Sequence, residues 1–432
     1  MLNVRSIVVA LLCASPAVML WDDLAVQGVL AGVIAIALVL TALSLRPGET
    51  EFLVSVSRPL AIAAIVPAAW IVFQVLPLRA FAHPIWGSTE AALGHSVAGA
   101  ITIDLGASLI GLGQYLTLCG FAFLCTALAV DRQRAEWLLF ALTAAGASVG
   151  LVVIWNNFVL EDFALLQFTL TQAIDCTVLG AIAAWTLLIR TVERFETRRA
   201  NPLRSINALM AAFAASCAAL LICAVALLAD GTRGEMFAAG CGAAALVFVT
   251  IVRRFGLGPW GIAAVAVPMV GVAAVLVMVQ MPTSGKNPLV AFANDSSAST
   301  TAISARVLED APLIGTGAGT FTGIAPVYRE AGDAPSAPTA ATTAATLAIE
   351  LGRPMVWLAL GAMVIAIIAL FQSALQRGRD SFYPAMGASA LIALSQLAFV
   401  NGGLVGNASG LMMAGTLGLA AAQRQSRSLQ PS

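Results

Sequence analysis

Residues 306–321, RVLEDAPLIGTGAGTF, carry the residue types best suited to chemistry in a chain that is otherwise almost continuously apolar. Gly315, Gly317 and Gly319 alternate there, which permits positive φ and close backbone approach to a ligand. Successive N–H groups in such a turn form a concave anion site. No Gly-Lys-Ser/Thr follows and no βαβ pattern surrounds the glycines, so the stretch is neither a P-loop nor a dinucleotide fingerprint. We expect either an anion-binding turn or a tight turn at the mouth of a helix bundle.

Three arginines could bind that anion. Arg306 and Arg329 flank the turn, and Arg233 opens an apolar segment in DGTRGEMFAAG. A planar guanidinium binds phosphate or diphosphate bidentately, which suits a lipid diphosphate at a membrane surface. The alternatives are solvated arginines and, for Arg233, a structural pair with Asp230 or Glu235.

The polar stretch also supplies candidate general bases. Glu309 follows Arg306 by three residues, and Glu350 enters the next apolar segment beside Arg353 in LAIELGRP. Either carboxylate could accept a proton, or they are surface acids and a charged pair at a helix start. The two histidines, His83 and His95, have no metal-ligand spacing, so we expect no metal site.

The composition requires a membrane. Of 432 residues, 60% are hydrophobic and 10% charged, with a mean hydropathy of +0.93, which no soluble domain of this size shows. The formal net charge is zero, so the chain lacks the excess of positive charge that nucleic-acid binding depends on. All seven cysteines lie in or beside apolar segments, so we expect small buried hydrophobes and no structural disulfide.

A membrane-spanning helix needs roughly 20 apolar residues. This rule predicts an all-α, polytopic bundle of about twelve transmembrane helices with one large external loop. The predicted spans are 6–21, 25–45, 57–77, 106–130, 135–156, 172–191, 205–229, 235–252, 259–281, 353–375, 382–401 and 404–422.

Charge placement predicts the orientation. With the N-terminus in the cytoplasm, sixteen of the 22 basic residues fall on the cytoplasmic side and six on the other. The positive-inside rule then places both termini in the cytoplasm. The chain divides into residues 1–281 with nine spans, an external loop at 282–352 with the candidate site, and 353–432 with three spans and a cytoplasmic tail.

Four motifs in order carry a resemblance to a known family. They are PLRAFAHPIW with ITIDLG, then GTRGEM opening a span, then RVLEDAPLIGTGAGTF, then AIELGRP opening the next span. This order resembles the superfamily of O-antigen ligases and Wzy-type polysaccharide polymerases. The resemblance implies an inner-membrane glycosyltransferase that needs no metal or cofactor. It would move a glycan from undecaprenyl diphosphate to a lipid or glycan acceptor on the periplasmic face.

The resemblance also implies roles for particular residues. Arg233 and Arg306 match arginines that hold the lipid diphosphate, the glycine turn matches a Pro-Leu-x-Gly-x-Gly stretch, and Glu350 matches the glutamate of a His-Asn-…-Glu-x-Gly pattern. The histidine of that pattern is replaced by Ala341. A polymerase-type relative with another base, a relative with altered chemistry and an inactive relative all stay open.

Two other classes of function compete with the glycosyltransferase. A non-catalytic partner of polysaccharide assembly proteins would explain the missing histidine. A transporter of lipid-linked glycan would place charges deep within its spans. Asp175 and Arg58 are the deepest candidates, and both lie near span ends.

Overall fold

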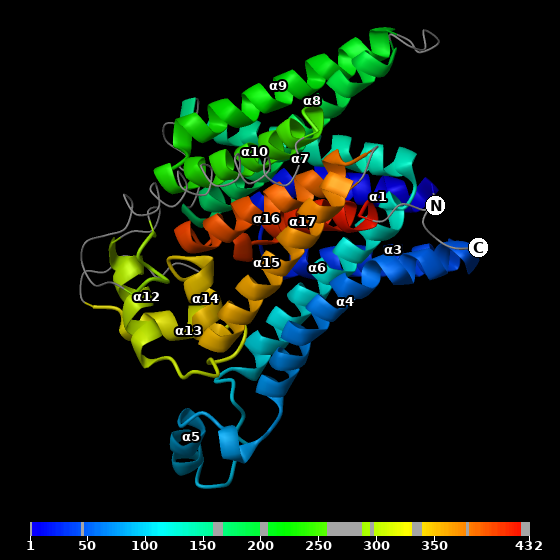
Figure 1. Ribbon diagram of the computed structural model, residues 1–432. Helices are drawn as coiled ribbons and strands as arrows, with labels where there is room; N and C mark the ends of the chain where they lie inside the picture. The colour runs from blue at the N-terminus through cyan, green and yellow to red at the C-terminus, as the bar shows by residue number, and fades with distance from the viewer. Residues whose placement is uncertain are drawn as a thin grey trace.

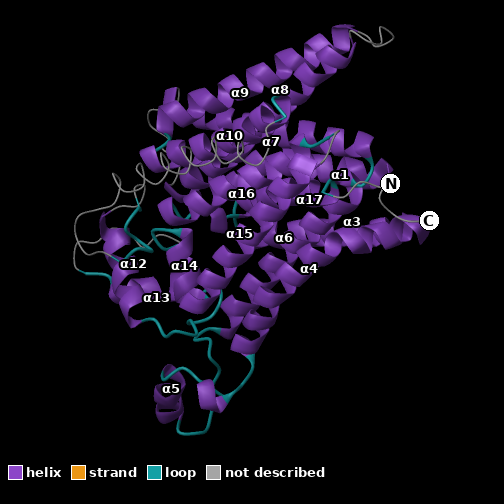
Figure 2. Ribbon diagram, viewed as in Figure 1, coloured by secondary structure: helices purple, strands orange, loops and turns teal. Residues whose placement is uncertain are grey.

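The computed structural model describes residues 2–44, 47–158, 167–198, 206–256, 287–293, 298–330, 339–376 and 380–424. Every regular element in these ranges is a helix, as Figure 1 and Figure 2 show. The long helices are α3 (Leu24–Ser44), α4 (Pro47–Val75), α6 (Leu105–Ala129), α7 (Arg132–Phe158), α8 (Gln167–Arg198), α9 (Ile206–Asp230), α10 (Arg233–Arg254), α15 (Arg353–Gln376) and α16 (Phe382–Val400). The short ones are α1 (Leu2–Cys13), α2 (Ser15–Leu20), η1 (Arg79–Phe81), α5 (Ile85–Leu93), α12 (Ala298–Asp310), α13 (Phe321–Ile324), η2 (Ala325–Tyr328), α14 (Thr343–Glu350), η3 (Gly403–Val405) and α17 (Asn407–Ala422).

Within the described ranges, nine helices are long and apolar enough to cross a membrane. They correspond to nine of the twelve predicted spans, so the all-helical bundle is confirmed. The predicted span 6–21 is divided between α1 and α2, and 404–422 contains the shorter helix α17 of 16 residues. The predicted span 259–281 lies outside the described residues.

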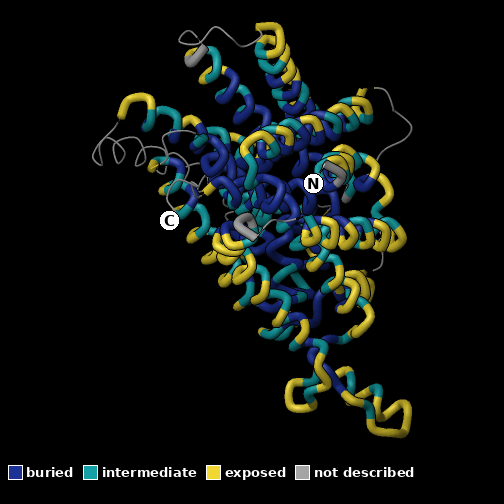
Figure 3. The backbone as a smooth tube through the Cα atoms, turned by 90° about the vertical axis from the view of Figure 1, so that its right-hand side faces the viewer, coloured by how far each residue is buried: buried dark blue, intermediate teal, exposed yellow. Residues whose placement is uncertain are grey.

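The centre of the bundle is formed by α8, α16 and α17, which pack against one another. In α8, 78% of the most apolar window is buried, whereas in α15 the share is only 11%. The outer helices therefore present apolar side chains outward, as lipid-facing helices do, and Figure 3 shows the buried core inside this exposed layer. Small residues allow close packing: a Cβ at Gly146 of α7 would lie 2.3 Å from Gly180 Cα of α8.

The bundle has two ends, which we name after the ends of α16. At the Ser381 end, Arg132 of α7 pairs with Asp380 at 2.8 Å, and Arg253 of α10 bonds to Ser381. At the Asn401 end, Asn401 contacts the start of α10 and the start of α14. Arg233, the first residue of α10, therefore lies at the Asn401 end, and Arg253, in its last turn, lies at the Ser381 end. Which end faces the cytoplasm stays a prediction.

The polar segment that follows α10 contributes a small helical layer at the Asn401 end. Its own apolar core joins α12, α13 and α14 through Val307, Leu308, Phe321, Ala345 and Ile349. A second segment, η1 with α5, projects beyond the tips of α4 and α6 at the bottom of Figure 1. Parts of the predicted loop 282–352, namely 282–286, 294–297 and 331–338, lie outside the described residues.

Candidate active site at the glycine-rich turn

The three alternating glycines adopt the backbone conformation that their spacing predicts. Gly315, Gly317 and Gly319 have φ of 82°, 110° and 73°. Side chains are also sterically excluded there: a Cβ at Gly315 would lie 2.2 Å from Glu350 O, and one at Gly317 would lie 2.1 Å from Thr102 Oγ1. The positions therefore require glycine for conformation and for space.

Backbone hydrogen bonds fasten this turn to the end of α14. Thr316 N–H donates to Ile349 O at 2.9 Å, and Gly317 N–H donates to Glu350 O at 3.0 Å. Gln74 at the tip of α4 donates through Nε2 to the carbonyl oxygens of Ile314 and Glu350, both at 2.9 Å. The turn is thus a rigid junction between the polar layer and the membrane helices.

The hydrogen-bond partner of this turn belongs to the chain itself. Phe321 N–H donates to Glu350 Oε1 at 3.2 Å, and Gly319 N–H also bonds to the carboxyl group. The sequence predicted that the glycine turn binds the anion of a ligand. That stays a prediction, and in this structure the two N–H groups bond to the carboxyl group of Glu350.

The surroundings of the Glu350 carboxyl group change its acidity. The residue keeps some exposed surface, but its carboxyl group is enclosed by protein. Burial raises the pKa of Glu350 from an ordinary 4.5 to about 7, and this outweighs the bonds from Gly319 and Phe321 that lower it. A carboxyl group with a pKa near the working pH is suited to general acid–base catalysis.

Two arginines of the same layer differ in their surroundings. Arg306, on the last turns of α12, pairs with Glu330 and donates from Nε to Ala302 O at 3.3 Å. Its side chain is 30% exposed and that of Glu330 76%. Arg353, which the sequence treated only as a helix-start residue, donates from Nη2 to Leu308 O at 2.8 Å. Its buried Nε has no hydrogen-bond partner among the described residues. In the sequence, the nearby Glu350 was the one signal that Arg353 could belong to this site.

Arg233 lies at the opposite end of α14 from the glycine turn. It is the exposed first residue of α10, and no ion pair joins it to another described residue. The predicted alternative of a pair with Glu235 is not formed, because Glu235 is buried and completes a capping box with Thr232. Asn401 links the start of α10 to Thr343 at the start of α14. The eight residues of α14 span roughly 12 Å, so α14 separates this region from the turn.

The remaining candidates lie at the surface of the polar layer. Glu309, in the last turn of α12, and Arg329, directly after η2, are exposed. Ala341 is buried before α14, where its N–H donates to Ser304 Oγ at 2.9 Å. The structure thus places Glu350 with Gly315, Gly317 and Gly319, and leaves Glu309 and Arg329 outside that contact.

The sequence analysis named Asp175 and Glu235 separately, but it did not predict that both meet at Asn401 beside α14. Asn401 Nδ2 donates to Asp175 Oδ1 at 3.0 Å and to Glu235 Oε1 at 2.7 Å. Asp175 is fully buried in α8, so two carboxyl groups share one amide inside the bundle. A single acidic residue within an apolar span was the only available signal. Among the described residues, no three His, Cys, Asp or Glu side chains are grouped to hold a metal ion.

The fold and this site define a class: a polytopic, all-helical protein of membrane type with a polar layer at one end. A scan against models of known protein families finds no match, and neither does a search of the curated proteins.

Proposed function

We propose that this chain is a bacterial inner-membrane glycosyltransferase that moves a glycan from undecaprenyl diphosphate to an acceptor hydroxyl on the periplasmic face. Both termini then lie in the cytoplasm and the Asn401 end faces the periplasm. The observation that carries the proposal is Glu350, a carboxyl group with a pKa of about 7 held by the glycine turn. The motif order described above supports the glycan chemistry.

In this proposal Glu350 is the general base. The acceptor oxygen attacks the anomeric carbon, the bond from that carbon to the diphosphate oxygen breaks, and the diphosphate leaves with the electron pair. The acceptor proton moves to the Glu350 carboxylate. Glu350 thereby replaces the histidine that the ligase pattern would place at Ala341.

The arginines in this proposal neutralise the leaving group. Arg306 is the principal ligand, because its partner Glu330 is mostly exposed and such pairs contribute about 1 kcal/mol or less. A diphosphate can therefore displace Glu330 from the guanidinium. Arg233 and Arg329 are exposed on the same end of the bundle, where they can contact the rest of the lipid-linked glycan.

The decisive experiment measures glycan transfer by purified protein supplied with undecaprenyl diphosphate-linked glycan. We expect Glu350→Gln to lower the rate by roughly 10²–10⁴-fold, the range for a lost general base. Glu309→Gln, on exposed α12 surface, is the matched control and should retain the rate. Transfer by Glu350→Gln at the wild-type rate would contradict the catalytic role of Glu350 and would favour the alternative that the chain is a non-catalytic partner of polysaccharide assembly proteins.

Polymerisation and ligation share this chemistry and differ only in the acceptor. Envelope polysaccharide from a deletion strain distinguishes them. Loss of long chains indicates a polymerase, whereas full-length chains that stay on undecaprenyl diphosphate indicate a ligase.

One observation favours a second candidate, a transporter of lipid-linked glycan. Buried ionisable groups within spans mark ion or substrate pathways, and Asp175 shares Asn401 with Glu235 inside the bundle. Under this reading, Asp175→Asn abolishes movement of lipid-linked glycan across vesicles while Glu350→Gln leaves it intact. The glycosyltransferase proposal requires covalent transfer that depends on Glu350.

A further inference from the structure

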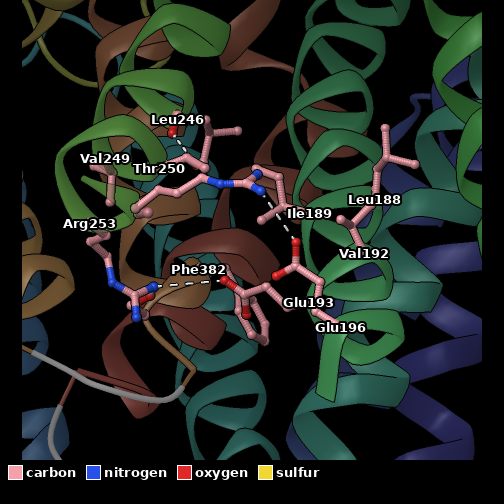
Figure 4. A pocket seen from close by; sticks show the side chains of 13 residues that line it. Leu188, Ile189, Val192, Glu193, Glu196, Leu246, Val249, Thr250, Arg253 and Phe382 are labelled. Carbon is pink, nitrogen blue, oxygen red and sulfur yellow. Dashed lines mark hydrogen bonds and ion pairs between the residues drawn. The ribbon is translucent and has the colours of Figure 1, made fainter. Parts of the chain in front are cut away.

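A cavity of about 340 Å³ lies at the Ser381 end of the bundle, opposite to the glycine turn. Side chains of α8, α10 and α16 line it, and Figure 4 shows them. Leu188 and Val192 of α8 and Leu246 and Val249 of α10 give it apolar walls. Its size falls at the small end of ligand pockets, which measure about 300–1,000 Å³.

The mouth of this cavity carries charge of both signs. Glu193 and Glu196 are three residues apart, on one face of α8. Arg253 and Arg254 end α10 across the opening. Two positive and two negative groups therefore surround one apolar pocket.

These charges are only loosely paired with each other. Arg253 Nη1 lies 3.9 Å from Glu193 Oε1, and Arg254 Nη2 lies 3.5 Å from Glu196 Oε1. The side chains of Arg254 and Glu196 are 71% and 61% exposed. Arg253 and Glu193 are less exposed, at 26% and 46%, and Arg253 also bonds to Ser381. Exposed pairs are weak and long ones weaker still, so a ligand with complementary charges can replace both pairs.

We infer that this cavity binds a zwitterionic aminophospholipid, with the phosphate on Arg253 and Arg254 and the ammonium on Glu193 and Glu196. Guanidinium groups are the preferred partners of phosphate. The cavity takes the headgroup and the first part of one acyl chain, which lies against Leu188 and the other apolar walls. The ends of membrane-spanning helices are the depth at which lipid headgroups lie.

Charge balance selects the headgroup. An anionic phospholipid such as phosphatidylglycerol has a phosphate for the arginines but no cation for the two glutamates. The glutamates would then repel its phosphate or remain on the arginines. Phosphatidylethanolamine satisfies both signs at once, so the site should discriminate between two lipids of equal chain length.

The test is native mass spectrometry of the full chain in detergent, titrated with phosphatidylethanolamine or phosphatidylglycerol of identical acyl chains. Wild type should bind phosphatidylethanolamine about tenfold more tightly, as expected for one extra charge-assisted contact. The double variant Arg253→Gln with Arg254→Gln should lose about tenfold in affinity for both lipids. Arg134→Gln is the matched control, since Arg134 lies in the first turn of α7 and does not line the cavity.

The glutamate variant gives an independent outcome. Glu193→Gln with Glu196→Gln should remove the preference for phosphatidylethanolamine. Phosphatidylglycerol should bind this variant more tightly than it binds wild type, because the glutamates no longer repel its phosphate or occupy the arginines. Elution of each variant as a single species on size exclusion shows that it is folded. If the arginine variant is not folded, the glutamate variant by itself still tests the inference. Equal binding of both lipids by wild type, or unchanged lipid preference in the glutamate variant, would overturn the inference.

Discussion

Replacing Glu350 with glutamine should make the folded chain more stable above pH 7. Its carboxyl group is enclosed by the glycine turn and α14, and burial raises its pKa from 4.5 to about 7. The folded chain therefore binds this proton more tightly than the unfolded chain does between pH 4.5 and 7. Because of this difference, the free energy of unfolding falls as the pH rises through that window. Glutamine does not titrate in this range, so the free energy of unfolding of the variant does not fall in this way as the pH rises.

The size of the effect follows from the same values. A pKa difference between 4.5 and 7 corresponds to about 3 kcal/mol of unfolding free energy above pH 7. Part of this gain is cancelled, because the glutamine amide cannot accept both N–H groups that now bond to the carboxylate. One such lost bond costs about 1–2 kcal/mol. We therefore expect a net gain of about 1–2 kcal/mol at pH 8.

Thermal unfolding in detergent, followed by tryptophan fluorescence at pH 5 and pH 8, measures this difference. Glu350→Gln should have a Tm higher than wild type by about 2–4 °C at pH 8, with a smaller gap at pH 5. Glu309→Gln, an exposed acid on α12, should show no gap that changes with pH. If Glu350→Gln melts below wild type at both pH values by the same amount, the carboxylate stabilises the fold and the reasoning is refuted. The gain in stability should accompany the loss of transfer activity, as at other functional sites.

Four further outcomes are expected. Gly317→Ala should prevent the turn from docking, because φ is 110° and its Cβ would meet Thr102; the yield of folded protein on size exclusion measures this, and wild-type yield would contradict it. Arg306→Ala should slow glycan transfer by about a hundredfold or more and Arg306→Lys should recover only part, since lysine lacks the bidentate fork; equal rates in a transfer assay would exclude this role. All seven cysteines are free, so alkylation should give the same mass before and after reduction; a mass gained only after reduction would reveal a disulfide. Reporter fusions at Gly332 and Gln376 should report opposite sides of the membrane. If both report the same side, the proposed topology is wrong.

The candidate site was partly predictable from local pattern. Alternating glycines require positive φ, and the turn at Gly315, Gly317 and Gly319 has it. The pattern also indicated a ligand anion, which stays a prediction, but not that Glu350 would accept a hydrogen bond from Phe321 across 29 positions. Glu309 and Glu350 were both candidate general bases in the sequence, and the family resemblance pointed to Glu350. Packing separates them: the carboxyl group of Glu350 is enclosed, and burial raises its pKa, whereas Glu309 is exposed at the surface.

Membrane character was determined by the sequence alone. A helix in lipid satisfies its own backbone hydrogen bonds, so a local run of apolar residues is enough to indicate one, and nine predicted spans appear as long helices among the described residues. The tertiary structure decided which polar groups meet. Asn401 reaches Asp175 across 226 positions and Glu235 across 166, and Gln74 reaches Glu350 across 276. Such contacts depend on how whole helices pack, and the burial that tunes Glu350 arises only from that packing.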